Sequence, residues 1–152
     1  MQNAVNIKNK KAKFEYEILD KYTAGIVLTG TEIKSIRDSK ASIAESFCEF
    51  NEQNELFVIN MTIQEYVYGN YYNHKPKAER KLLLNKRELK KLAKEVNTKG
   101  LTIVPLRLFI NEKGFAKLDI ALAKGKKLFD KRDTIKDRDN KRDLDRIKKN
   151  FN

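Results

Sequence analysis

The chain has 152 residues, 36% of them charged, and its 33 Lys and Arg against 21 Asp and Glu leave a net charge of +12. One cysteine excludes a disulfide framework within the chain, and no apolar run reaches the roughly 18 residues of a membrane-spanning helix. These limits favour a single domain whose partners are polyanions, such as RNA, DNA or anionic lipid.

Positive charge is concentrated at the two ends of the chain. Residues 1–13 carry four Lys and no acid, and they contain no apolar signal region, so we expect a cytoplasmic protein. Residues 124–152 hold eight Lys, four Arg and six Asp, with too few apolar residues to build a core. We therefore expect a basic N-terminal arm at 1–13, a globular domain at 14–123, and a basic tail at 124–152 that stays mobile until an anionic partner holds it.

The domain begins with sheet-like patterns. Alternation of apolar and polar residues predicts a strand at 14–18, and the run at 24–28 predicts a second one. Thr31 is the expected N-cap of a short helix, on which Ile33 and Ile36 form the buried edge.

Two further strands are predicted near 46–50 and 56–59, joined by an Asn-rich turn. Residues 63–76 are rich in tyrosine and end at a proline, which is typical of irregular structure or an edge strand. The tyrosines of this segment are expected to pack in the core or along an edge, with base stacking as the alternative.

The clearest helix of the chain is predicted to follow Asn85. Asn85 and Glu88 have the spacing of a capping box, and Gly100 is a natural C-terminal stop. One helical face carries the apolar residues Leu89, Leu92, Ala93 and Val96.

Two strands at 102–110 and 115–123, connected by a hairpin loop, close the domain. The second of them alternates, with Leu118, Ile120 and Leu122 on one face and Lys117, Asp119 and Ala121 on the other. About six strands with two or three short flanking helices predict a mainly β fold, a small closed barrel of OB type whose loops form the binding surface.

Catalysis has few candidate residues. Cys48, the only thiol, lies in a predicted strand, where a cysteine is usually a small buried residue. His74, the only histidine, lies in the tyrosine-rich segment, where a surface or loop-packing role is favoured. The sequence contains neither a glycine-rich phosphate loop nor a Cys/His cluster of metal-ligand spacing. We expect no catalytic residue, no metal and no cofactor, with a metal-independent nuclease as the enzymatic alternative.

Five phrases in collinear order resemble the small protein B family (SmpB, or SsrA-binding protein), the protein partner of transfer-messenger RNA (tmRNA). They span nearly the whole chain and are NKKAKFEYEI (9–18), YTAGIVLTGTEIKSIR (22–37), RKLLLNKREL (80–89), GLTIVPL (100–106) and AKGKKLFDKR (123–132).

The resemblance implies an OB-like barrel that binds the tRNA-like domain of tmRNA and delivers it to stalled ribosomes. It further implies that the tail enters the empty mRNA channel and folds there as a helix, after which the nascent chain is tagged for degradation. The implied partners are tmRNA, the ribosome, chiefly its small-subunit rRNA, and elongation factor Tu indirectly through the RNA, with no membrane. Without the resemblance, a general basic OB-type RNA-binding or ribosome-assembly protein is the alternative.

Site residues follow from the resemblance by position. Glu32 and Lys117 match the RNA-binding glutamate and lysine of the family, although an acid at the start of a helix also interacts favourably with the helix dipole. The remaining RNA-binding positions implied are Asn9, Lys10, Lys11 and Lys34. The tail positions implied to meet the decoding centre and mRNA channel are Gly125, Lys126, Lys127, Phe129, Asp130, Lys131, Arg132, Leu144 and Ile147.

Phe129 departs from the family pattern, which has Tyr or His at this position. Stacking on a base survives that change, whereas a hydrogen bond through the side chain does not. If the tail becomes helical, Leu144, Ile147 and Phe151 share one stripe, and acid–lysine pairs four residues apart lower the cost of forming the helix on a partner.

Overall fold

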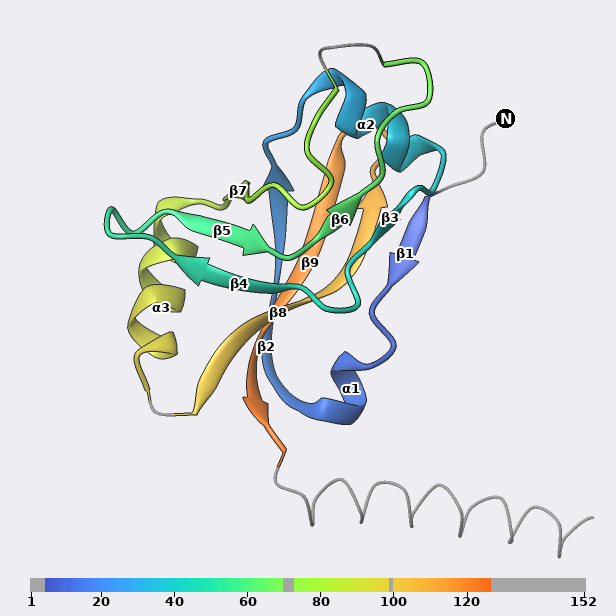
Figure 1. Cartoon of the computed structure of the whole chain (residues 1–152). Helices are drawn as coiled ribbons and strands as arrows, with labels where there is room; N and C mark the ends of the chain where they lie inside the picture. The colour runs from blue at the N-terminus through green and yellow to red at the C-terminus, as the bar shows by residue number, and fades with distance from the viewer. Residues whose placement is uncertain (1–4, 70–72, 99, 127–152) are drawn as a thin grey trace, which may run out of the picture.

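A computed structural model of the chain describes residues 5–69, 73–98 and 100–126. The described residues form nine strands and three helices (Figure 1). In chain order these are β1 (Asn6–Lys8), α1 (Ala12–Glu15), β2 (Tyr16–Ile26), α2 (Gly30–Arg37), β3 (Ala41–Ser42), β4 (Phe47–Phe50), β5 (Leu56–Ile59), β6 (Thr62–Ile63), β7 (Arg80–Leu83), α3 (Lys86–Val96), β8 (Leu101–Ile110) and β9 (Ala116–Gly125). None of the helices in this part of the chain is long and apolar enough to cross a membrane.

Six antiparallel strands close into a ring. The order β1-β8-β4-β5-β7-β2-β9 is completed by a pairing of β8 with β9, so the sheet returns on itself and β1 is added beside β8. β3 and β6 form a separate two-stranded sheet. The predicted OB-like fold, mainly β with about six barrel strands, is confirmed.

Long strands make up one wall of the barrel. β2 pairs with β9 and β9 with β8 over nearly their whole lengths, and each pairing contains a register shift, near Ile18 and near Pro105. Pro105 has no backbone N–H to donate to the neighbouring strand. Proline is therefore tolerated at a bulge, where the regular hydrogen bonding is already interrupted. These irregularities let long strands bend around the core.

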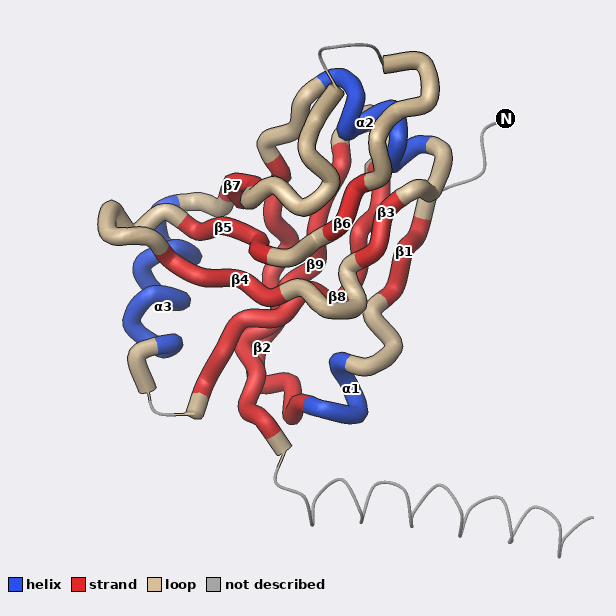
Figure 2. The backbone as a smooth tube through the Cα atoms, in the orientation of Figure 1, coloured by secondary structure: helices blue, strands red, loops and turns tan. Residues whose placement is uncertain are grey.

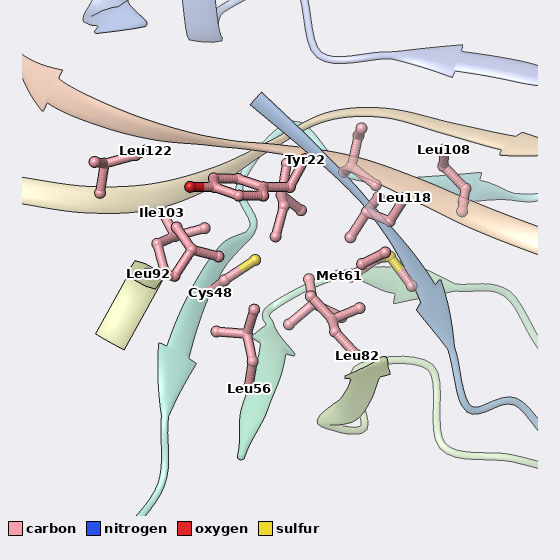
Figure 3. Packing of buried hydrophobic residues seen from close by; sticks show 14 of the residues in the cluster. Tyr22, Cys48, Leu56, Met61, Leu82, Leu92, Ile103, Leu108, Leu118 and Leu122 are labelled. Carbon is pink, nitrogen blue, oxygen red and sulfur yellow. The ribbon is translucent and has the colours of Figure 1, made fainter. Parts of the chain in front are cut away.

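The core fills the inside of this ring. Figure 3 shows Cys48 lying among Tyr22, Leu56 and Ile103, and all four side chains are buried. Burial raises the pKa of the Cys48 thiol, because the thiolate would lose its hydration. The interpretation of Cys48 as a small buried residue is confirmed.

The helix α3 follows the prediction closely. The Asn85 side chain accepts a hydrogen bond from the Glu88 backbone N–H at 2.9 Å, and the Glu88 side chain accepts from the Asn85 backbone. Leu92 is fully buried in the main core, with Leu89 and Val96 packed against that core. The local capping box and apolar stripe therefore determine this helix.

The predicted strands at 14–18 and 24–28 are corrected. Phe14 lies in α1, and the residues from Tyr16 to Ile26 form one 11-residue strand. The reason is tertiary: Ala12 is buried against β8 and β9, which turns the chain before β2 starts. Hydrogen bonding to β9 then keeps the chain extended through residues 19–23, where the alternation of apolar and polar residues does not by itself predict a strand.

Thr31 is not the N-cap of α2, and this prediction was wrong. Thr29 occupies that position, and its hydroxyl accepts from the Glu32 backbone N–H at 3.4 Å. Glu32 returns the contact by accepting from the Thr29 backbone at 2.9 Å. Ile36 is fully buried as expected, whereas Ile33 is half-buried.

Candidate nucleic-acid interface

The outer face of the barrel carries an apolar and cationic patch around Gly25. Gly25 on β2 pairs with Leu83 on β7 and with Lys117 on β9. A Cβ at Gly25 would lie 3.5 Å from the Leu83 Cβ and 3.7 Å from the Lys117 Nζ, so both side chains meet over the glycine backbone. Leu83 and Val27 are each 51% exposed. We call Gly25, Val27, Leu83 and Lys117 the Lys117 patch.

Beside this patch, β1, α1, β2, α3, β8 and β9 surround an open cavity of about 810 Å³. Thr23 and Asp119, the cross-strand pair next to Gly25 and Lys117 on the same face, lie in its wall. Five cations line the cavity against two carboxylates, Glu88 and Asp119; the cations are Lys8, Lys10, Lys13, Lys21 and Arg107. We call this the basic cavity. Such an excess of positive charge in a recess attracts phosphates.

The sequence pattern did not single out Arg107, Lys21 or Lys13. The available signal was the alternation that places Lys117 and Asp119 on one face of a strand. Arg107 lies opposite Asp119 in the β8–β9 register, and its Nε donates to Asp119 Oδ2 at 3.0 Å. Residues from distant segments thus come together only through the closed sheet.

Glu32, expected to bind RNA, is buried, with 4% of the residue exposed. Its Oε1 accepts from the Thr29 backbone, and its Oε2 accepts from Arg80 Nε in a buried ion pair. Burial alone would raise the pKa of Glu32, but the hydrogen bonds from Thr29 and Arg80 and the charge of Arg80 outweigh it and lower the pKa. In this structure Glu32 lies in the first turn of α2, and both of its carboxylate oxygens accept hydrogen bonds from within the protein. Lys117, by contrast, lies on the outer face of the barrel.

A second contact fastens the same helix. His74 Nδ1 lies 2.9 Å from the Thr31 hydroxyl, and His74 Nε2 lies 2.9 Å from the Ile63 carbonyl. Figure 2 shows α2 and the loop between β6 and β7 at the same end of the barrel. We call the pairs Glu32–Arg80 and Thr31–His74 the α2 latch. The loop-packing role of His74 is confirmed. Among the described residues, no group of three His, Cys, Asp or Glu could hold a metal ion.

Asn9 is also buried, at 9% exposed. Its amide donates to the Pro105 carbonyl at 2.9 Å and approaches the Ile43 carbonyl at 3.5 Å. Its Oδ1 has no hydrogen-bond partner among the described residues. Asn9 therefore ties the basic arm to β8 and directs the neighbouring lysines outward.

Three of the lysines expected to bind RNA are exposed, namely Lys10, Lys11 and Lys34. Lys10 lines the basic cavity, and Lys11 forms an ion pair with Glu45 at 2.9 Å. Lys34 lies on α2, with its ammonium 5.5 Å from the centroid of the Tyr66 ring. Tyr68 is 81% exposed, which corrects the expectation that this tyrosine packs in the core or along an edge.

The start of the basic tail is joined to the domain. Gly125 pairs with Tyr16 at the end of β9, and the Lys126 backbone donates to the Glu15 carbonyl at 3.0 Å. The Lys126 ammonium donates to the Lys13 carbonyl at 3.2 Å. The other predicted tail positions, Lys127, Phe129, Asp130, Lys131, Arg132, Leu144 and Ile147, lie outside the described residues.

Comparisons with known proteins agree with one another. The family model described as "SmpB protein" matches residues 6–150. The SsrA-binding protein of Flavobacterium psychrophilum is 77% identical over 151 residues, 99% of this chain and 100% of the relative, and that of Flavobacterium johnsoniae is 66% identical over 152 residues, 100% of both. A solved structure, "tmRNA-SmpB: a journey to the center of the bacterial ribosome", covers 82% of this chain and 87% of its own, at 47% identity and a TM-score of 0.68. The chain therefore belongs to the SmpB protein family.

Proposed function

We propose that this chain binds the tRNA-like domain of tmRNA and delivers it to stalled ribosomes for trans-translation, so that incomplete polypeptides are tagged for degradation. The relatives are SsrA-binding proteins, and the similar solved structure is that of tmRNA with SmpB and the bacterial ribosome. The observation that carries the proposal is the continuous outer face formed by the Lys117 patch and the basic cavity. Phosphates pair with its cations, and bases or riboses pack on its apolar part.

The role is one of binding, because the only thiol is buried and the only histidine is engaged inside the latch. The proposed partners on the ribosome are chiefly small-subunit rRNA, with elongation factor Tu bound indirectly through the RNA, all in the cytoplasm. Neither a cofactor nor a metal is part of this proposal.

Recognition and tagging are proposed to reside in different parts of the chain. The barrel binds the RNA, and the tail beyond Lys126 occupies the mRNA channel near the decoding centre. Because Gly125 and Lys126 still pair with the start of the domain, truncation after Lys126 removes the tail without shortening β9.

The truncated chain tests this division. We expect it to bind the isolated tRNA-like RNA as tightly as the full chain and to fail in tagging on ribosomes stalled without a codon. Unchanged tagging by the truncated chain would contradict the role of the tail. Co-purification with many unrelated RNAs, in place of tmRNA, would favour a general OB-type RNA-binding or ribosome-assembly protein.

A further inference from the structure

We propose that Arg107 binds a backbone phosphate of the RNA in the basic cavity, and that Asp119 and Phe109 hold its guanidinium in position for that contact. The ligand chemistry is a phosphodiester of folded RNA, so the inference rests on the proposed function and adds a residue and an arrangement to it. Asp119 is a positioning residue in this proposal, because it acts through Arg107.

The carboxylate of Asp119 is fully engaged by its neighbours. Its Oδ1 accepts from the Thr23 hydroxyl at 2.7 Å, and its Oδ2 accepts from Arg107 Nε at 3.0 Å. Thr23 and Asp119 come from paired strands, and so do Arg107 and Asp119. Three adjacent strands therefore determine where the carboxylate lies, and its two oxygens are directed at donors within the protein.

The guanidinium is held on a second side by an aromatic ring. The Arg107 Cζ lies 4.0 Å from the centroid of the Phe109 ring, within the range of a cation–π contact. With Nε bound to Asp119, neither Nη1 nor Nη2 of Arg107 donates to another described residue. A planar fork that is fixed at one edge and stacked on one face presents its remaining N–H groups with little loss of side-chain entropy.

Stability does not explain this arrangement. The Arg107 and Asp119 side chains are 39% and 25% exposed, and ion pairs with such exposure contribute little to folding. The pair is instead surrounded by further cations, as expected of an anion-binding site. Lys8 lies opposite Arg107 in the β1–β8 register, and Lys10 and Lys21 line the same cavity.

The cavity can admit a stretch of nucleic-acid backbone. It is open to solvent and lined by five cations, so a chain carrying several phosphates can enter it and pair with them. Its volume of about 810 Å³ exceeds that of one phosphate group, so several lysines and Arg107 can contact successive phosphates.

The test uses the full chain and the tRNA-like domain of tmRNA, with the dissociation constant measured over a range of salt concentrations. Asp119→Asn removes one negative charge and so raises the net charge by one, which on a purely electrostatic surface would tighten RNA binding. We expect Asp119→Asn to weaken binding by about threefold or more, because Arg107 loses its fixed orientation. Arg107→Lys, which keeps the charge and loses the fork, should weaken binding by a similar factor.

The matched control is Asp20→Asn. Asp20 forms the same kind of exposed pair with Lys91, at 3.1 Å, and does not line the cavity. This variant makes the same change in net charge and should bind as tightly as the wild type or more tightly.

Arg107→Ala should also reduce the slope of log affinity against log salt by about 1, which a purely structural role would not do. Equal thermal midpoints of the variants exclude a folding defect as the cause.

Two results overturn the inference. If the wild type binds the tRNA-like RNA and Asp119→Asn binds like Asp20→Asn, Asp119 does not position Arg107. If Arg107→Lys and Arg107→Ala bind like the wild type, Arg107 does not contact phosphate. A wild-type chain without preference for the tRNA-like RNA over an unrelated folded RNA would overturn the proposed function and this inference together.

Discussion

Glu32 and Arg80 form a buried ion pair that joins the first turn of α2 to the first residue of β7, with 4% and 3% of the two residues exposed. The guanidinium also donates to three backbone carbonyls, those of Met61, Lys75 and Pro76. A glutamate in this setting has a structural role, because its ion pair with Arg80 fastens a helix and a loop to the barrel.

Glu32→Ala is therefore expected to destabilise the protein. It leaves the Arg80 charge buried without its partner, and breaking a buried pair costs about 3–5 kcal/mol. Urea denaturation of the wild type and the variant measures this difference. The control is Glu45→Gln, which breaks the exposed pair with Lys11 and should cost less than about 1 kcal/mol. A Glu32→Ala variant with wild-type stability and reduced RNA affinity would instead indicate a direct RNA contact.

The stability contributed by Glu32 should depend on pH. Its pKa in the folded state is lowered, so its contribution is fully present above the unfolded value of about 4.3 and is lost as pH falls through the folded-state pKa. The difference in unfolding free energy between the wild type and Glu32→Gln should accordingly shrink between pH 7 and pH values below about 4. Chemical denaturation of both proteins over this range checks the sign. A difference that grows as the pH falls would contradict it.

Lys117→Ala should weaken binding of the tRNA-like RNA several-fold without changing stability. Lys117 is on the outer face, where its ammonium lies near Gly25 and Leu83, and removing one phosphate contact should lower the salt slope by about 1. Lys77→Ala, an exposed lysine in the loop before β7, is the control for loss of one charge. If both variants lose the same affinity, net charge explains the effect and the Lys117 patch does not.

Phe129→Ala should impair tagging on stalled ribosomes and leave affinity for the tRNA-like RNA unchanged. The reason is that a tail residue stacks on a base of the decoding centre in the proposed function, and loss of one stacking contact costs about 1–3 kcal/mol. Phe129→Tyr retains the ring and should retain tagging. Parallel tagging and RNA-binding assays separate the two steps, and equal losses in both would contradict a role confined to the decoding centre.

Some elements could be predicted because their signals are local. The helix α3 depends on Asn85 and Glu88, three residues apart, and on an apolar stripe of its own, so the structure reproduces it. The N-cap of α2 has an equally local signal, because Thr29 and Glu32 have capping-box spacing. Thr31 is a second threonine at the same helix start, so the pattern offers two candidates and the structure selects Thr29.

Other features depend on residues far apart in the chain. The predicted pair of strands became the single strand β2 because β9, about a hundred residues later, pairs along its length. The ion pair of Glu32 joins positions 48 residues apart, and Thr23 bonds to an aspartate 96 residues away. No spacing rule connects such positions, so the exposure of Glu32 and the partners of Arg107 could not be predicted from pattern.

The sequence by itself determined the class of partner, the OB-like fold and the family, because net charge, alternation and collinear motifs are properties of the chain as written. Only the tertiary structure decided which of the predicted RNA-binding residues face outward. Closing the barrel directs alternate side chains of every strand to the core or to the surface. Tertiary contacts bury Glu32 and Asn9 and leave Lys117 half-buried on the outer face. They also gather cations from β1, β2, β8 and α1, together with Lys10, around one cavity.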